Sequence, residues 1–149
     1  MKIAILREAG GLGDMVATEP VVRALKKKYP QAEVWYAGLP EYREVLEMWE
    51  VKPDVYYEVD MAKRRDWDAV ADSERWPYLK AFEKFDRIID LFCPAYIYER
   101  QMKNQTDKSR VELFCEASGV SFSTPKMVVA EKKREWAKGW LSGKGVTFE

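Results

Sequence analysis

The start of the chain limits the possible folds most, because a short apolar run leads through a glycine-rich turn into a helical pattern. Residues 2–6 (KIAIL) are almost unbroken apolar, which is typical of a parallel strand covered on both faces. The turn at 10–14 (GGLGD) follows, and apolar residues then recur at helical spacing as far as Tyr29. Pro20 lies inside this pattern, so we expect the helix to kink there or to restart with Thr18 as its cap.

The rest of the chain repeats the alternation of strand and helix. A second apolar run at 32–38 begins about 30 residues after the first, which is the spacing of a β-α-β unit with its crossover helix. Further strand patterns occur at 54–59 and 87–92, and Ser109 with Glu112 forms a capping box for a late helix. The sequence therefore predicts an α/β fold, a Rossmann-like parallel sheet with helices on both faces.

Composition excludes several classes of function. The chain has 149 residues, with 25 basic and 25 acidic side chains that cancel, so it lacks the positive charge of a typical nucleic-acid binder. It contains no histidine, which excludes Ser-His and Cys-His catalytic pairs and imidazole zinc sites. Proton transfer must therefore use Asp, Glu, Lys, Tyr or Cys.

The cysteines and the apolar runs indicate the compartment. Cys93 and Cys115 lack the spacing of a metal or redox pair, and we expect both to be reduced and buried. No run approaches the roughly 20 apolar residues that cross a bilayer, and the N-terminus has no signal-peptide pattern. We expect a cytoplasmic protein without a transmembrane segment.

The glycine turn is the first candidate for a binding site. In a parallel α/β sheet, ligands bind where strands end and helices begin, and Gly11, Leu12 and Gly13 would bring backbone amides to that place. The dinucleotide motif fails because Val16 stands at its third glycine, and no Gly-Lys-Ser/Thr follows for a P-loop. Asp14 has two open interpretations, a cap for the helix amides or an acceptor of a proton from a substrate hydroxyl.

Several of these segments together resemble a known family. Residues 1–7, 11–25 and 29–30 resemble the N-terminal signature of glycosyltransferase family 9, the ADP-heptose:lipopolysaccharide heptosyltransferases, in their strand, Gly-Asp, Thr-x-Pro and Arg-Ala-Leu elements. Residues 85–91 and 111–119 resemble a later strand and helix of that family. The double glycine at the turn and the glutamate before Pro20 depart from its pattern and leave the substrate open.

The resemblance implies a fold and a reaction. It implies the GT-B fold, two Rossmann-like domains facing a cleft, with a nucleotide-sugar donor, a saccharide acceptor and no metal or other cofactor. Residues 1–142 would be the acceptor-side domain, and residues 143–149 a linker or the start of a missing second domain that binds the donor. Asp14 would be the general base, and Gly11, Leu12 and Gly13 would contact the donor phosphate or the transferred sugar. We therefore expect this chain alone to be inactive; the resemblance also leaves open a peripheral place at the inner membrane.

A basic loop adds a second, looser point of resemblance. Lys63, Arg64 and Arg65 follow the third predicted strand, where heptosyltransferases carry basic residues that bind a phosphorylated acceptor. The other interpretation is a solvated loop balanced by Asp66 and Asp68.

A different class of function also fits these patterns. The chain would then be a non-catalytic Rossmann-like module that binds a phosphorylated metabolite or a partner protein. In either case Trp136 and Trp140, one helical turn apart, predict an apolar face that a second domain covers or through which the chain self-associates.

Overall fold

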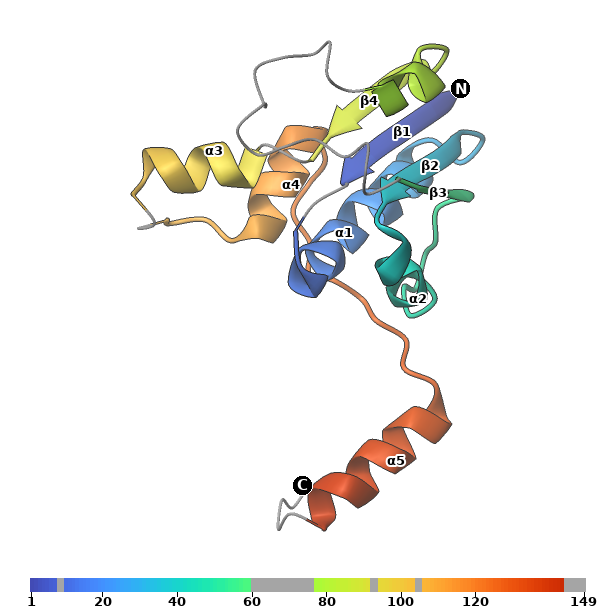
Figure 1. Ribbon diagram of the computed structural model, residues 1–149, viewed down its shortest axis with the longest axis vertical. Coiled ribbons are helices and arrows are strands. Elements are labelled where there is room, and N and C mark those ends of the chain that lie inside the picture. Colours follow the sequence, from blue (N-terminus) through green and yellow to red (C-terminus); the bar gives the residue numbers. More distant parts are fainter. Residues whose placement is uncertain (8–9, 60–76, 92–93, 104–105, 144–149) are drawn as a thin grey trace.

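A parallel four-stranded sheet forms the centre of the protein (Figure 1). The computed structural model describes residues 1–7, 10–59, 77–91, 94–103 and 106–143. The strands, in the spatial order β3-β2-β1-β4, are β1 (Lys2–Arg7), β2 (Glu33–Gly38), β3 (Val55–Glu58) and β4 (Arg87–Asp90). In the register, Ile5 of β1 lies beside Tyr36 of β2 and Ile89 of β4. The predicted fold class is confirmed.

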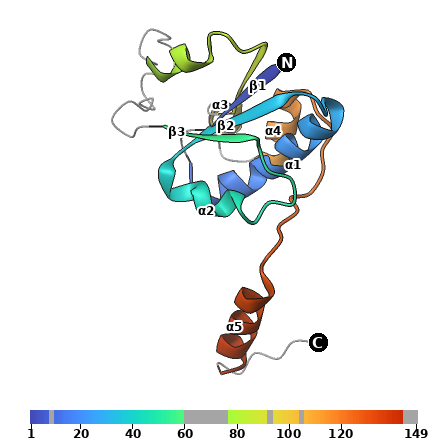
Figure 2. The same cartoon turned by 90° about the vertical axis from the view of Figure 1, so that its right-hand side faces the viewer.

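Helices cover both faces of the sheet. The described helices are α1 (Leu12–Lys28), α2 (Arg43–Leu46), α3 (Pro94–Gln101), α4 (Arg110–Ser118), α5 (Glu131–Ser142) and the 3-10 helices η1 (Pro40–Tyr42) and η5 (Pro77–Phe82). Side chains of α1 to α4 pack in one core cluster, and η5 supplies Phe82 to the cluster on the opposite face. Figure 2 shows η5 across the sheet from α1 and α2.

The strand β1 explains why the first residues are almost all apolar. Ile3 and Ile5 belong to the cluster under the long helices, whereas Ala4 and Leu6 belong to the cluster with Phe82. All four β1 residues are at most 1% exposed. Successive side chains of a strand point to opposite faces, so a strand covered on both faces needs apolar residues at every position.

Helix α1 corrects one expectation from the sequence. The helix runs from Leu12 to Lys28 with Pro20 inside it, so the predicted restart at Thr18 is wrong. The Thr18 hydroxyl instead donates to the Met15 carbonyl at 2.8 Å and lies 2.8 Å from the Tyr36 hydroxyl. Proline removes one helical hydrogen bond, and burial of the whole segment around it outweighs that loss.

Helix α4 has the ends that its sequence predicts. The Glu112 amide donates to Ser109 Oγ at 3.3 Å, and the Ser109 amide donates to Glu112 Oε2 at 2.7 Å. Gly119 ends the helix in the left-handed region at φ 62°. Cys115 is a buried free thiol, as expected, whereas Cys93 lies outside the described residues.

A buried carboxylate clamps the segment after α4 onto α1. Glu19 is fully buried and accepts hydrogen bonds from Arg23 Nε at 2.9 Å and from the Lys126 amide at 2.9 Å. Arg23 Nη2 also donates to the Thr124 carbonyl at 2.8 Å. Residues 119–127 are thereby held across the helix, and α5 follows, extending away from the sheet in both views (Figures 1 and 2).

Replacing Glu19 with alanine is expected to lower the free energy of unfolding by about 3 kcal/mol, because it leaves the partly buried Arg23 guanidinium without its carboxylate. Urea unfolding followed by tryptophan fluorescence measures the change. Glu44→Ala, at an exposed position of α2, is the control and should change stability by less than about 0.5 kcal/mol. Equal effects of the two substitutions would contradict the clamp.

Burial of Tyr36 makes stability depend on alkaline pH. Burial raises the pKa of Tyr36 well above the ordinary value, more than the hydrogen bond with Thr18 lowers it. The unfolded chain then loses the phenol proton at about pH 10, before the folded chain does, so stability should fall as pH rises above about 10. Urea midpoints measured across this range check the slope, which Tyr36→Phe should reduce. An unchanged slope in that variant would be the contrary result.

Candidate functional site

The candidate site lies at the carboxyl ends of β1 and β4, where the direction of the strand order changes. From β1 the chain first builds β2 and β3 on one side, and then returns to place β4 on the other side. In sheets of this kind ligands bind in the crevice outside the strand ends at that point. The starts of α1 and α4 both lie at this edge (Figure 1).

Helix α1 begins at the glycine turn, and Asp14 is not its N-cap residue. Gly11 is the N-cap residue in an extended conformation, and Asp14 is the third residue of the helix. Asp14 Oδ2 accepts a hydrogen bond from the Gly11 amide at 3.0 Å, so the carboxylate caps the turn from inside the helix. Gly11, Leu12 and Gly13 are exposed, and at this end of a helix amides have no intrahelical acceptor.

Asp14 is buried between two arginines. Its side chain is 5% exposed, Oδ2 lies 3.0 Å from Arg7 Nη2, and Oδ1 accepts a hydrogen bond from Arg110 Nη1. Arg7 belongs to β1 and Arg110 is the first residue of α4. Neither arginine was predicted as a site residue, because no local pattern links Asp14 to the buried end of the preceding strand or to a residue 96 positions further on.

The inner arginine is held rigidly. Arg7 is buried, donates from Nη1 to the Leu91 carbonyl at 3.2 Å, and lies with its guanidinium carbon 5.2 Å from the centre of the Phe114 ring. These contacts join the ends of β1 and β4 to α4. Arg7 therefore provides a fixed positive charge under the carboxylate of Asp14.

The outer arginine is held by a second carboxylate. Arg110 Nε and Nη2 donate to the two carboxylate oxygens of Glu99 on α3, at 2.7 and 2.9 Å. The hydrogen bonds with Glu99 first, and then with Asp14, raise the pKa of Arg110 above its ordinary value. The guanidinium thus stays charged and connects α1, α3 and α4 at one place.

Gly10 is the residue that lets the backbone pass over the ion pair. Its φ is +111°, and a Cβ atom there would lie 2.3 Å from both Arg7 Nη2 and Asp14 Oδ2. The Tyr42 hydroxyl fixes the turn by donating to the Gly10 carbonyl at 3.1 Å. Only glycine fits both the conformation and the space.

The basic loop predicted to bind a phosphorylated acceptor lies outside the part of the chain that the structure describes. Lys63, Arg64 and Arg65 lie outside the described residues, and their role stays a prediction.

Among the residues that the structure describes, no three Cys, Asp or Glu side chains gather as a metal site would require. No helix in the described ranges is long and apolar enough to span a membrane.

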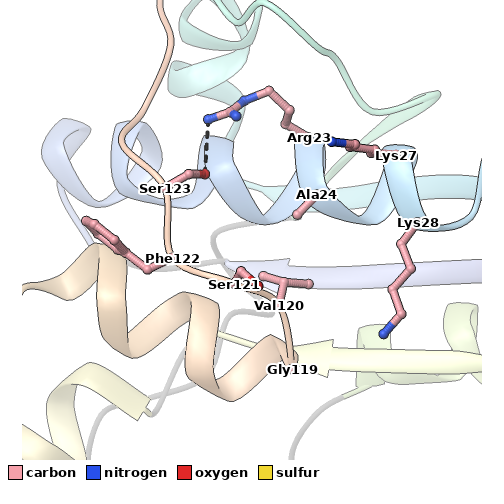
Figure 3. A pocket seen from close by; sticks show the side chains of 9 residues that line it. All are labelled: Arg23, Ala24, Lys27, Lys28, Gly119, Val120, Ser121, Phe122 and Ser123. Atoms are coloured by element: carbon pink, nitrogen blue, oxygen red, sulfur yellow. Dashed lines mark hydrogen bonds between the residues drawn. The ribbon is translucent and has the colours of Figure 1, made fainter.

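A pocket of about 610 Å³ lies away from the strand ends, between the second half of α1 and residues 119–123 (Figure 3). Arg23 on its wall is bound to Glu19 and, at 3.3 Å, to Ser123. The pocket adjoins the carboxyl-terminal ends of α1 and α4, where helix dipoles disfavour anions. Its lining residues include no carboxylate that could act as a base, unlike the cluster around Asp14.

Comparisons with known proteins show which solved structures share this fold. No family model and no curated protein matches the chain. A solved glycosyltransferase family 9 structure from Veillonella parvula is 19% identical with a TM-score of 0.58, and the match covers 98% of this chain and 50% of that one. The ADP-heptose LPS heptosyltransferase II of E. coli is 15% identical with a TM-score of 0.53, over 95% of this chain and 51% of that one. The chain thus spans about half of each of these proteins and has the fold of one half of a GT-B glycosyltransferase, as the family resemblance implies.

Proposed function

We propose that this chain is the acceptor-side half of a glycosyltransferase that moves a heptose-like sugar from a nucleotide-sugar to a saccharide acceptor. The observation that carries the proposal is the position of Asp14. It is a carboxylate in the first turn of α1, at the strand ends where this fold binds ligands, and a fixed arginine lies beneath it. A cytoplasmic location is part of the proposal.

In the proposed reaction Asp14 is the general base. It takes the proton of an acceptor hydroxyl while that oxygen attacks the anomeric carbon of the donor, and the nucleoside diphosphate leaves with the electrons of the broken bond. The amides of Leu12 and Gly13, two exposed residues, contact the donor phosphate or the transferred sugar, since the start of a helix favours negative charge. The proposal includes no metal, and it assigns a phosphorylated acceptor to the loop at 63–65.

The proposal includes a second domain that binds the donor. Residues 1–142 form the acceptor side and residues 143–149 lead towards that domain, in keeping with the half-length coverage of the structures compared above. Trp136 and Trp140 of α5 are 70% and 55% exposed, and we assign to them the contact with that domain. Self-association of the chain through the same face is the other form of the proposal.

The test begins with the product in its source cells. An antibody against this domain should detect a band of about twice the chain's mass or more, the size of a protein with a second domain. That product should release nucleoside diphosphate from one of a panel of nucleotide-sugars when a saccharide acceptor is present, whereas the 149-residue chain alone should show no turnover. Transfer by the isolated chain would contradict the need for a second domain. Absence of transfer across the panel would contradict the activity.

One observation favours a second candidate function, a non-catalytic module that binds a phosphorylated metabolite or a partner protein. Both carboxylate oxygens of Asp14 already have arginine partners, which is typical of a structural ion pair. Under this hypothesis Asp14→Asn lowers stability or affinity modestly, and no form of the protein transfers sugar.

A further inference from the structure

We propose that Arg110 is a positioning residue that gates Asp14. Arg110 covers the carboxylate in the free protein, and a phosphoryl group of the bound ligand draws it away before Asp14 accepts a proton. This inference rests on the proposed function, because it concerns how the base becomes available to an acceptor hydroxyl.

The two oxygens of Asp14 differ in their surroundings. Oδ2 faces the interior, where the Arg7 guanidinium and the Gly11 amide each lie 3.0 Å away. Oδ1 is bound to Arg110, whose side chain is 46% exposed whereas Asp14 is 5% exposed. A substrate hydroxyl must approach a carboxylate oxygen to about 2.6–3.2 Å, so the outward route to Asp14 passes the guanidinium of Arg110.

The two arginines also differ in their freedom to move. Arg7 is buried against Phe114 and the Leu91 carbonyl, so displacing it would disturb the core. Arg110 reaches Asp14 with Nη1 alone and is otherwise held by Glu99 at its other two nitrogens. The guanidinium is planar, so it turns away from Asp14 together with the Glu99 carboxylate, and both hydrogen bonds between the two side chains persist. Glu99 thus balances the charge of Arg110 when the gate is open.

The chemistry of the donor identifies the ligand class that opens the gate. Guanidinium groups bind phosphate oxygens with the same N–H groups that bind carboxylates, so a phosphoryl group and Asp14 compete for Nη1 of Arg110. A proposed glycosyl transfer supplies such a group from two sources, the diphosphate of the donor and a phosphate on the acceptor. Opening is thus coupled to the presence of substrate, and the buried carboxylate stays covered without it.

The test is a double-mutant cycle on phosphate binding, which requires no turnover. Inorganic pyrophosphate represents the donor diphosphate, and glucose 6-phosphate represents a phosphorylated sugar; each is titrated by calorimetry at constant ionic strength. Asp14→Asn should tighten binding by about tenfold because Arg110 loses its competitor. In an Arg110→Ala background the same substitution should change binding less than about twofold. The probe with the larger coupling identifies the source.

Equal tightening by Asp14→Asn in both backgrounds would overturn the gate, since Asp14 would then act only as a nearby negative charge. The gate is also overturned if removing Arg110 changes the affinity for neither probe, or if neither probe binds at millimolar concentrations.

Thermal melts establish that the variants are folded. Where Asp14→Asn does not fold, side-chain NMR of the parent chain replaces the cycle: the Arg110 guanidinium signals, assigned from their loss in Arg110→Lys, should shift with the probe while those of Arg7 do not. Unmoved Arg110 signals at saturation would overturn the gate.

The two proposals fail in different ways. A coupled cycle without sugar transfer by the source-cell product would contradict the proposed activity and leave Arg110 and Asp14 as competing parts of a phosphate-binding site. Sugar transfer that depends on Asp14 together with an uncoupled cycle would show that the acceptor reaches the carboxylate with Arg110 in place.

Discussion

Asp14→Asn is expected to reduce sugar transfer by about 10²–10⁴-fold in the enzyme that contains this domain, through a lower kcat and not through weaker binding of the acceptor. Asparagine keeps an oxygen that can accept the hydrogen bond from the Gly11 amide, so the turn at the start of α1 has its cap. It cannot take up a proton at neutral pH. The loss should therefore be in kcat, measured as release of nucleoside diphosphate under saturating acceptor.

A matched substitution separates this effect from general loss of an aspartate. Asp54 lies at the opposite edge of the sheet, just before β3, where it accepts hydrogen bonds from Lys26 at 2.5 Å and from the Val34 amide at 2.7 Å. Asp54→Asn should lower thermal stability without a specific loss of kcat. If Asp14→Asn instead keeps turnover within about twofold of the parent enzyme, Asp14 is a structural ion-pair partner and not the base.

Gly10→Ala is expected to be the most damaging small substitution in the loop, lowering the free energy of unfolding by about 3 kcal/mol. The added Cβ meets Arg7 Nη2 and Asp14 Oδ2 at 2.3 Å, and the φ of +111° is one that alanine rarely adopts. The buried ion pair cannot move aside without loss of its contacts to the core. Urea unfolding of the chain measures the change.

Gly13→Ala is the control for this prediction. A Cβ at Gly13 has no neighbour within 4 Å, and the residue lies in the first turn of α1. Alanine there should raise stability by up to about 1 kcal/mol, because it restricts the unfolded chain and favours the helix. Similar destabilisation by both substitutions would show that the turn tolerates no side chain at all, contrary to the specific clash at Gly10.

Local patterns predicted much of the fold. The unbroken apolar run of β1, the spacing to β2 and the capping box of α4 are all confirmed, because each depends on residues within one strand or one helical turn. The glycine turn before α1 was found in the same way, and so was Asp14 as its unusual carboxylate. The catalytic role of Asp14 and the role of the loop at 63–65 remain predictions.

What the sequence by itself determined is the order of the elements and the glycine turn after the first strand, where the candidate site lies, since backbone conformation and side-chain alternation follow from neighbouring residues. Only the tertiary structure decided that α1 continues through Pro20, that Glu19 clamps residues 119–127, and that Asp14 lies between two arginines. These features join residues up to 107 positions apart. Their energy comes from burial and ion pairing between elements, which become neighbours only when the sheet and its helices pack together.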